Sequence, residues 1–582
     1  MIEIPAVVRT GLLGKFFPFG FCYEFKHLIR LAIPIALTTL VAFLSGPISV
    51  ISCGLLGKHT LATVGLATSM FNVTGLAVIT GLLTAADTLF SQTYGSNRTH
   101  MMGIQLQRAI VIITFCCIPC VALHLLAEPV LLLMQQNPQI AKEAADYLLC
   151  ATPGLWFAAI GQCLTKYLQA QNTVYPPLWI GIIGNCLNAL LHYLLLYVIN
   201  VGVRGSAFSQ VIAYAFQCAC LVAYIMFKER NSSIWTGVSS KLWLDWGTWL
   251  KLALSGLIMV ALEWTIFELG TVIAGTLSQK QLSAQTILFN TETMLYILVP
   301  LGFGMATNVR VGQFLGAGSA VGPKSVLSVA LVTVLLLTST FATGVFLLRW
   351  QIPKAFTSDS DVIELTAHLL PIIAAFQLFD GTSGVCQGAI RGAGLQFIGA
   401  ITCFCSQYLF GASIALLLVF LAGYGLHGLW IGFTVGTVSQ ALVYCGVCKC
   451  IDWKKQVEMA RERTSDVRIV VPDENTLDVC SSANSLMGRY NEDLDSTTTL
   501  SSQQTEKEAL SKITKKSPIP FRILFGFILI VLLVTSACLR QYLPWSDYFG
   551  FYCVFPNDTF IRVSSRIPVP TNCSLVVPGT PP

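Results

Sequence analysis

The chain is a succession of long apolar stretches separated by short polar segments. Each stretch has roughly the 17–25 residues that an α-helix needs to cross a bilayer. One polar segment, residues 453–518, is long and rich in Ser, Thr, Glu and Lys. The pattern predicts an all-α polytopic membrane protein with thirteen helices, near residues 30–51, 64–90, 107–127, 145–168, 176–199, 206–227, 250–275, 284–308, 325–348, 364–388, 397–421, 427–448 and 522–539.

Composition supports this class. Of the 582 residues, 54% are hydrophobic and 11% are charged, whereas a soluble protein carries about 25% charged residues. The net charge of +6 does not indicate nucleic-acid binding, because the basic residues are scattered among membrane boundaries. Most of the 20 cysteines lie in apolar stretches and are interpreted as small packing residues. The C-x-x-C-x-C run at residues 445–450 has no matching His or Cys pair, so no metal site is expected.

Charge bias predicts the orientation. Basic residues gather in the segments that would face the cytoplasm if the N-terminus is cytoplasmic. An odd number of helices then places the C-terminal tail outside. That tail contains two N-glycosylation acceptors, Asn557 and Asn572, and two cysteines, Cys553 and Cys573, that could pair in an oxidising compartment. No cleavable signal peptide is expected, and the sequons favour the plasma membrane, with a vesicular membrane as the alternative.

The two halves of the chain repeat at a nearly constant offset. Gln92-Thr-Tyr-Gly matches Gln313-Phe-Leu-Gly at 221 residues, and Lys166 matches Arg391 at 225. An even number of helices in each copy predicts two parallel six-helix lobes with pseudo-two-fold symmetry, the substrate site near their interface, and alternating access. The expected domains are a cytoplasmic N-terminus (1–29), the N-terminal lobe (30–228), a connector (229–249), the C-terminal lobe (250–450), a disordered cytoplasmic linker (451–520), the thirteenth helix (521–540) and an extracellular tail (541–582).

Two glutamates interrupt an apolar helix. Glu263 and Glu268 are the only charges in residues 252–275, and a charge at that depth costs at least a few kcal/mol, so it marks an ion or solute path by default. The alternative is a pair of neutral carboxylic acids bonded between helices. Because the two lie about 140° apart at 100° per residue, we assign coupling to Glu263 and place Glu268 on the outer cavity wall or in helix contacts.

Several motifs carry a family resemblance over residues 25–450. They are LAIP at 31–34, SQTYGS at 91–96, LEWTIFE at 262–268, NTETMLYILVPLGFGMATNVRVGQFLGAG at 290–318 and QLFDGTSGVCQGAIRGAG at 377–394. In combination they resemble the multidrug and toxin extrusion (MATE) transporters of eukaryotic type. The resemblance implies twelve core helices, a vertebrate-like thirteenth helix, and export of organic cations and drugs in exchange for protons or sodium.

The sequence departs from that family at three places. The glutamate usual early in helix 8 is replaced by Asn290, with Glu292 nearby, so the register of this charge stays open. The usual glutamate of helix 10 is Asp380, which keeps the charge on a shorter arm and has a structural role beside Arg391 as its alternative. Some prokaryotic members of the family couple protons through an aspartate in helix 1, whereas residues 31–50 contain no carboxylate, which shifts proton coupling to the C-terminal lobe.

Aromatic residues near the acids suit organic cations through cation–π contact. The candidates are Trp264, Phe267, Phe289 and Tyr296, with packing or lipid contact as the alternative for each. Asn72 is a polar cavity candidate in the N-terminal lobe. A second polar group, Asn185, Asn188 and His192, is expected to form interhelical hydrogen bonds.

The predicted function is therefore a proton-coupled exporter of organic cations that acts as a monomer in the lipid bilayer, without a cofactor. A MATE-type exporter of organic anions or metabolites and a sodium-coupled antiporter remain alternatives. A membrane enzyme is disfavoured because no His, Asp or Ser constellation gathers at a membrane face. An ATP-driven pump is disfavoured because no P-loop is present.

Overall fold

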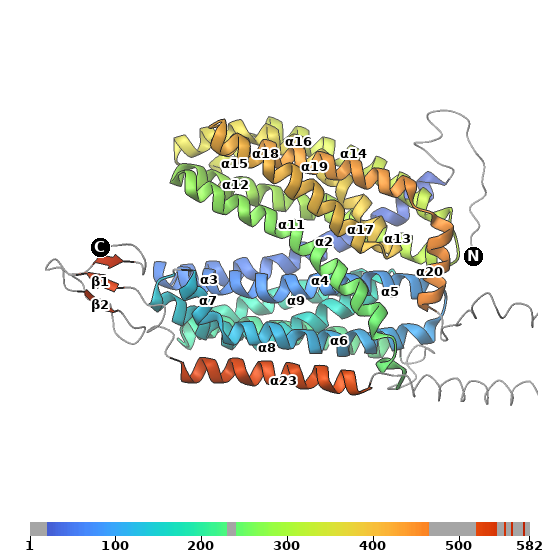
Figure 1. The fold of residues 1–582 in the computed structure, drawn as a ribbon, viewed down its shortest axis with the longest axis horizontal. Coiled ribbons are helices and arrows are strands. Elements are labelled where there is room, and N and C mark those ends of the chain that lie inside the picture. The colour runs from blue at the N-terminus through green and yellow to red at the C-terminus, as the bar shows by residue number, and fades with distance from the viewer. Residues whose placement is uncertain are drawn as a thin grey trace, which may run out of the picture. The chain divides into compact units, whose positions relative to one another are not determined.

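The computed structural model describes residues 20–134, 136–229, 240–464, 519–543, 552–554, 560–562 and 574–576. Twelve helical spans among these residues are long and apolar enough to cross a membrane. Six belong to each half of the chain, and the halves form two bundles, blue to teal and green to orange in Figure 1. The predicted all-α architecture of two six-helix lobes is confirmed.

The N-terminal lobe contains the first six spans. Its second span is a run of four consecutive helical segments, and π-helical turns occur in its second and fifth spans. Its elements are α2 (Phe21–Gly54), α3 (Lys58–Phe71), η1 (Asn72–Leu76), α4 (Ala77–Leu82), α5 (Thr84–Gly95), α6 (Thr99–Leu125), α7 (Ala127–Leu133), α8 (Pro138–Ala170), α9 (Tyr175–His192), η2 (Tyr193–Val198) and α10 (Val203–Lys228).

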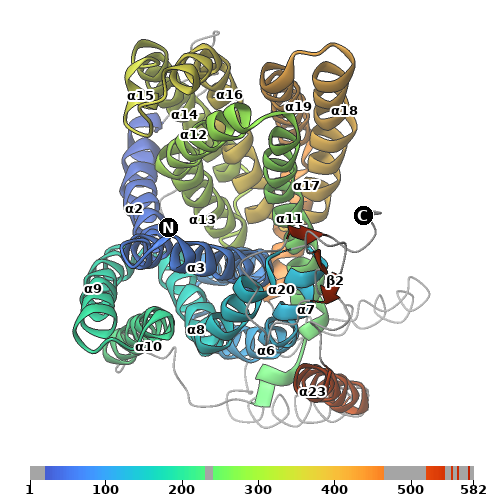
Figure 2. The ribbon, with the colours of Figure 1, turned by 90° about the vertical axis from the view of Figure 1, so that its left-hand side faces the viewer.

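The C-terminal lobe repeats this plan after a short connector, η3 (Ser240–Trp243). Figure 2 shows the two bundles along their length, with the C-terminal lobe above the N-terminal one. The elements are α11 (Trp246–Leu277), α12 (Gln279–Tyr296), η4 (Ile297–Leu301), α13 (Gly302–Gly316), α14 (Gly322–Leu347), α15 (Gln351–Lys354), α16 (Ser360–Ala393), α17 (Gln396–Cys403), η5 (Phe404–Ala412), α18 (Ser413–Leu416), η6 (Leu417–Leu421) and α19 (Gly425–Cys450).

Local sequence sets several helix ends. Asn137, Ser278 and Asp359 each cap the helix that follows by accepting a hydrogen bond from a backbone N–H of its first turn, as small polar residues at this position do. At the other end of α16, Gly394 takes a left-handed conformation with φ 77°, which glycine adopts without strain. These signals place both ends of α16, the helix that carries Asp380 and Arg391.

Each lobe lends part of its first helix to the core of the other lobe. Leu28, Leu31 and Ala32 of α2 are buried with residues of α13 and α16 in the C-terminal lobe. Trp249 and Leu252 of α11 are buried with residues of the N-terminal lobe. The exchange ties the two lobes together at one end of the bundle.

Small residues let helices of different lobes approach closely. A Cβ atom on Gly81 would lie 2.8 Å from the Cα atom of Leu257, and one on Gly302 would lie 2.8 Å from the Cβ atom of Ala36. Both pairs are related by the 221-residue offset, since residue 36 corresponds to residue 257 and residue 81 to residue 302. The lobes are therefore packed with the pseudo-two-fold symmetry that the repeat predicts.

Two further elements follow the core. α20 (Trp453–Thr464) is an ordered helix with Trp453 buried, so the expectation of disorder from residue 451 is wrong for this segment. Arg98 donates a hydrogen bond to the Thr464 carbonyl (2.8 Å), and Arg463 donates one to the Ala393 carbonyl (3.1 Å). Because these partners belong to different lobes, α20 bridges the two lobes.

The thirteenth helix and the tail are partly described. α23 (Ile519–Tyr542) has an apolar part, Gly526–Tyr542, that is shorter than the twelve core spans. Arg540 of this helix pairs with Asp146 at 3.0 Å. The tail adds three short strands to the helical fold, β1 (Tyr552–Val554), β2 (Phe560–Arg562) and β3 (Ser574–Val576), in the antiparallel order β2-β1-β3.

Candidate functional site

Three carboxylates from three helices of the C-terminal lobe lie close together. Glu263 comes from α11, Glu292 from α12 and Asp380 from α16. Asp380 interacts electrostatically with both glutamates. The three helices meet there because α12 packs against both α11 and α16. We call these three residues the acidic cluster.

Glu263 has the most polar partners in the cluster. Its carboxylate accepts hydrogen bonds from the side-chain amides of Gln387 on α16 and Gln440 on α19. The Arg391 guanidinium lies 3.9 Å from it, and the Arg391 and Glu263 side chains are 10% and 19% exposed respectively. Gln387 also accepts a hydrogen bond from Arg391. Glu263 is thus held between two amides and one cation in a largely buried setting.

The structure distinguishes Glu292 from Asn290. Glu292 is buried beside Asp380, whereas Asn290 is exposed and donates its side-chain N–H to the Thr286 carbonyl at 2.8 Å on its own helix. Asp380 keeps one carboxylate oxygen buried without a hydrogen-bond partner among the described residues. Of these two residues, Glu292 therefore lies in the acidic cluster, next to an acid that has one carboxylate oxygen without a hydrogen bond among the described residues.

A small cavity of about 10 Å³ lies between α13 and α16 next to the cluster, close to the space that one water molecule needs. Its polar lining comes from Tyr296, Asn308, Gln387 and Arg391. Tyr296 interacts electrostatically with all three acids and with Arg391. The predicted cavity residue Tyr296 thus belongs to the acidic cluster's surroundings.

The other aromatic candidates divide into two groups. Phe267 packs against Phe289, Phe376 and Phe433 with ring centroids 5.7–6.2 Å apart, one helical turn from Glu263. Trp264 points away, with 53% of its surface exposed. Phe267 and Phe289 therefore form an aromatic wall beside the cluster, and Trp264 does not join it.

Several predicted site residues lie away from the cluster. Glu268 is exposed on another face of α11, and Asn72 is exposed at the start of η1. Asn557, Asn572 and Cys573 lie outside the described residues, and only the backbone of Cys553 is described. Across the described ranges, no group of three His, Cys, Asp or Glu side chains could hold a metal ion.

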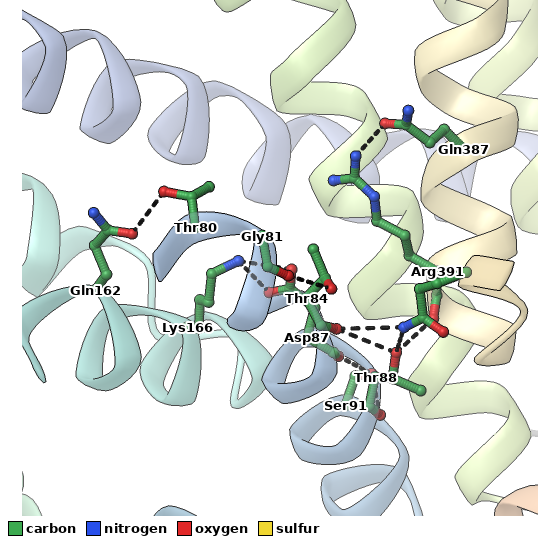
Figure 3. Close-up of polar contacts among 11 residues, drawn as sticks. Thr80, Gly81, Thr84, Asp87, Thr88, Ser91, Gln162, Lys166, Gln387 and Arg391 are labelled. Carbon is green, nitrogen blue, oxygen red and sulfur yellow. Dashed lines mark hydrogen bonds and ion pairs between the residues drawn. The ribbon is translucent and has the colours of Figure 1, made fainter. Parts of the chain in front are cut away.

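The lobes close on each other at one end, which we call the junction. There Thr88 donates to the Arg391 carbonyl (2.7 Å), Gln92 donates to the Gly392 carbonyl (2.9 Å), and Gln396 donates to Thr88 (2.7 Å). Figure 3 shows α5 of the N-terminal lobe against the end of α16. Arg391, whose side chain approaches Glu263, is therefore held at its backbone carbonyl by Thr88 of the N-terminal lobe.

The N-terminal lobe has its own buried polar groups. Asp87 and Lys166 form an ion pair at 2.6 Å, with side chains 4% and 11% exposed (Figure 3). The expected interhelical bonds of the fifth span are confirmed. Asn185 donates to the Val41 carbonyl, Asn188 donates to Ser45 (3.4 Å), and His192 shares a hydrogen bond with Ser206 (2.9 Å). Asp87 and Lys166 thus pair with each other, whereas the carboxamide oxygens of Asn185 and Asn188 stay buried without a hydrogen-bond partner among the described residues.

Gln387 was not singled out from the sequence, although a signal for it existed. It lies seven residues after Asp380 and four before Arg391, and residues at these spacings share one helix face. A second missed residue, Asn308, lines the small cavity and could have been found as the repeat partner of Asp87. Both signals can be used only after these residues have been assigned to helices.

Comparisons with known proteins agree with this architecture. The MatE family model matches residues 34–194 and again residues 257–417, which begin 223 residues apart and lie one within each lobe. The repeat inferred from the sequence is therefore present in the family description itself.

Individual relatives cover most of the chain. Multidrug and toxin extrusion protein 1 of Xenopus tropicalis is 37% identical over 460 residues, 78% of this chain and 79% of that protein. Multidrug and toxin extrusion protein 2 of Mus musculus is 38% identical over the same length, with the same shares of both chains. The crystal structure of the eukaryotic MATE transporter AtDTX14 matches with a TM-score of 0.72 and 28% identity, covering 77% of this chain and 100% of that one.

The two matches to the family model, the vertebrate relatives and the solved transporter all cover the two-lobe core that holds the acidic cluster. The chain is a multi-pass membrane protein that belongs to the multidrug and toxin extrusion (MATE) family of transporters.

Proposed function

We propose that this protein exports organic cations in exchange for protons by alternating access, and that Glu263 couples the two. The acidic cluster carries the proposal, because it places three buried or half-buried carboxylates close together in one lobe. Relatives that cover most of the chain are named multidrug and toxin extrusion proteins. These names refer to the export of varied drugs and toxins, which suits a site that combines carboxylates with aromatic side chains.

Proton coupling follows from competition for one carboxylate. A low-dielectric setting disfavours the charged form of a carboxyl group, so Glu263 gains from taking up either a proton or a cationic substrate. If Glu263 bound a proton and a cationic substrate at the same time, the substrate's positive charge would have no counter-charge. If the two exclude each other at Glu263, uptake of a proton from one side releases the cation, and the cycle exports one against the other.

The surroundings of Glu263 support an organic rather than an inorganic cation. Phe267 and Phe289 supply ring faces one turn along the helix, and such faces attract alkylammonium groups. Tyr296 adds a hydroxyl between the acids. Among the described residues, no group of three His, Cys, Asp or Glu side chains is arranged to hold a metal ion, which supports protons rather than sodium as the coupling ion.

The identity of Glu292 also bears on the substrate class. With Glu292 buried beside Asp380, the C-terminal lobe keeps a full set of acids despite Asn290. An organic anion would meet three carboxylates against one guanidinium, Arg391. The balance favours a cationic substrate.

We further propose a plasma-membrane location with the N-terminus in the cytoplasm and the C-terminal tail outside, as the positive-inside rule indicates. In this orientation the junction faces the cytoplasm. The protein would act as a monomer, with the linker to the thirteenth helix beginning after α20. The sequons at Asn557 and Asn572 would then be glycosylated.

The test is uptake of labelled tetraethylammonium into proteoliposomes under an imposed pH gradient, in which inward movement of the cation is driven by outward movement of protons. Native protein is compared with Glu263→Gln, and Glu268→Gln serves as the matched control, because it removes an exposed acid from the same helix. We expect pH-driven uptake to be lost in Glu263→Gln and kept in Glu268→Gln.

A parallel run with a sodium gradient and no pH gradient separates the coupling ions. If sodium alone drives uptake, sodium and not the proton is the coupling ion. Uptake that keeps its full pH dependence in Glu263→Gln would move coupling to another residue. Absence of tetraethylammonium uptake in well-folded protein would contradict organic-cation export.

A further inference from the structure

The two lobes carry a cationic residue at corresponding positions, but the partners of that residue differ. Lys166 of the N-terminal lobe corresponds to Arg391, and Asp87 corresponds to Asn308 at the 221-residue offset that also relates Gln92 to Gln313. In the N-terminal lobe the acid is present, and it pairs with its lysine at 2.6 Å. In the C-terminal lobe the corresponding acid is replaced by a neutral amide.

This replacement leaves polar groups unused around Arg391. Asn308 is fully buried, and neither its amide nitrogen nor its amide oxygen has a hydrogen-bond partner among the described residues. The same holds for the Nε atom of Arg391. Both residues line the small cavity between α13 and α16. The guanidinium, which lacks the acid that its counterpart has, reaches instead toward Glu263 at 3.9 Å.

We propose that Arg391 is a built-in counter-cation of Glu263, one that competes with the transported cation and the proton for that carboxylate. The proposal rests on the proposed function, since it assumes that Glu263 is the coupling residue. Arg391 is then a positioning and specificity residue. It sets how tightly Glu263 holds what it binds and allows the bound species to leave.

The other groups around Glu263 do not supply this charge. Asp380 on α16 is an acid, and the hydroxyls of Tyr296 on α12 and Tyr444 on α19 and the Cys403 thiol on α17 carry no positive charge. Gln387 and Gln440 are neutral amides. Among the described groups that interact with Glu263, Arg391 alone is a cation.

Competition has a direct consequence for affinity. While Glu263 is ionised and without substrate, Arg391 stabilises it. An organic cation or a proton that arrives has to replace that stabilisation. Weakening the hold of Arg391 on Glu263 should therefore tighten the binding of both, lower the apparent KM and slow the release step.

The decisive variant is Asn308→Asp, because it restores the acid that the N-terminal lobe has and gives Arg391 a partner of its own. We expect the apparent KM for tetraethylammonium to fall on the order of tenfold, the pH of half-maximal transport to rise, and maximal turnover to drop. Asn308→Leu is the matched control of similar size without charge, and it should shift KM and the pH midpoint much less than Asn308→Asp does.

A double-mutant cycle shows whether the effect passes through Arg391. Arg391→Gln should shift KM and the pH midpoint in the same direction as Asn308→Asp, and Arg391→Lys, which keeps the charge, should restore both toward native values. In the Asn308→Asp, Arg391→Gln double variant, the added acid should lower KM no further than Arg391→Gln alone. Folded state is checked by size-exclusion chromatography of fluorescently tagged protein.

Distinct outcomes separate the two proposals. If the native protein shows no pH-driven uptake, the proposed function fails. If the native protein is pH-driven but Asn308→Asp and Asn308→Leu share native KM and pH midpoint, the counter-cation proposal is overturned. Arg391 then acts only through its backbone bond to Thr88. If Arg391→Gln does not fold, the comparison of Asn308→Asp with Asn308→Leu still decides, because it leaves the arginine in place.

Discussion

Replacing Gly95 by alanine should open the junction without unfolding the protein. Gly95 ends α5, and a Cβ atom there would lie 2.7 Å from both the carbonyl carbon and the Cα atom of Gln313, and closer still to its carbonyl oxygen. These are backbone atoms of the opposite lobe, so no side-chain rotation relieves the overlap. The two lobes have to separate.

The size of the effect follows from neighbouring bonds. Moving from 2.7 Å to ordinary contact at 3.4 Å requires a shift of at least 0.7 Å. The same shift would lengthen the bond from Gln92 to the Gly392 carbonyl, now 2.9 Å, beyond the range of a hydrogen bond. The Thr88 bond to the Arg391 carbonyl, now 2.7 Å, would be strained as well. At about 0.5–1.5 kcal/mol for each bond, the junction loses about 1–3 kcal/mol, which shifts the closed population by about 5–150-fold.

The assay is hydrogen–deuterium exchange followed by mass spectrometry on protein in nanodiscs. Amides of α5 and α13 at the junction should exchange faster in Gly95→Ala than in native protein, because lobe separation exposes them. Gly161→Ala in α8 is the matched control, since a Cβ atom there meets nothing within 4 Å and the change favours the helix.

Equal exchange at the junction in Gly95→Ala and Gly161→Ala would refute the reasoning. It would mean that the backbone contact between Gly95 and Gln313 does not hold the lobes together. Slower exchange would be a stronger contradiction, because no rearrangement that keeps this junction could accommodate the added methyl group.

Two further predictions concern buried and bridging charges. Asp87→Asn leaves Lys166 without its counter-charge and should cost about 3–5 kcal/mol, seen as a lower Tm in detergent, whereas the paired change Asp87→Leu with Lys166→Met should be nearly neutral; equal losses in both would show that the pair itself, not the unpaired lysine, sets stability. Arg463→Ala removes the bond to the Ala393 carbonyl and should speed hydrogen exchange in α20 while the middle of α16 stays protected; unchanged exchange in α20 would show that its other contacts suffice.

The fold could be predicted largely from periodicity. Apolar runs of membrane-spanning length mark the helices because the bilayer forces each span to satisfy its own backbone hydrogen bonds. Span ends were less accurate. α2 begins nine residues before the expected residue 30, because helices that leave the bilayer can continue in water. α20 was missed because a short amphipathic helix packed on both lobes has the polar composition of a linker.

The candidate site was predicted only in part. Glu263 and Asp380 could be chosen because a carboxylate in an apolar stretch is costly wherever it lies. The choice between Asn290 and Glu292 could not be made, since a register error of one or two residues rotates a helical position by 100–200°. Trp264 was chosen as an aromatic residue next to Glu263 in sequence and Asn72 as a polar residue in an apolar stretch, and neither criterion states which way a side chain points.

The sequence by itself determined that this is a duplicated, membrane-spanning transporter with acids in its second lobe, because hydropathy, repeat offset and charge are properties of residues taken in order. Only the tertiary structure decided which acids meet, that Arg391 faces Glu263 while Thr88 of the other lobe holds its backbone, and that Asn308 leaves that arginine without the partner its counterpart has. Those facts depend on contacts between residues far apart in the chain, and such contacts are set by how helices pack rather than by local sequence.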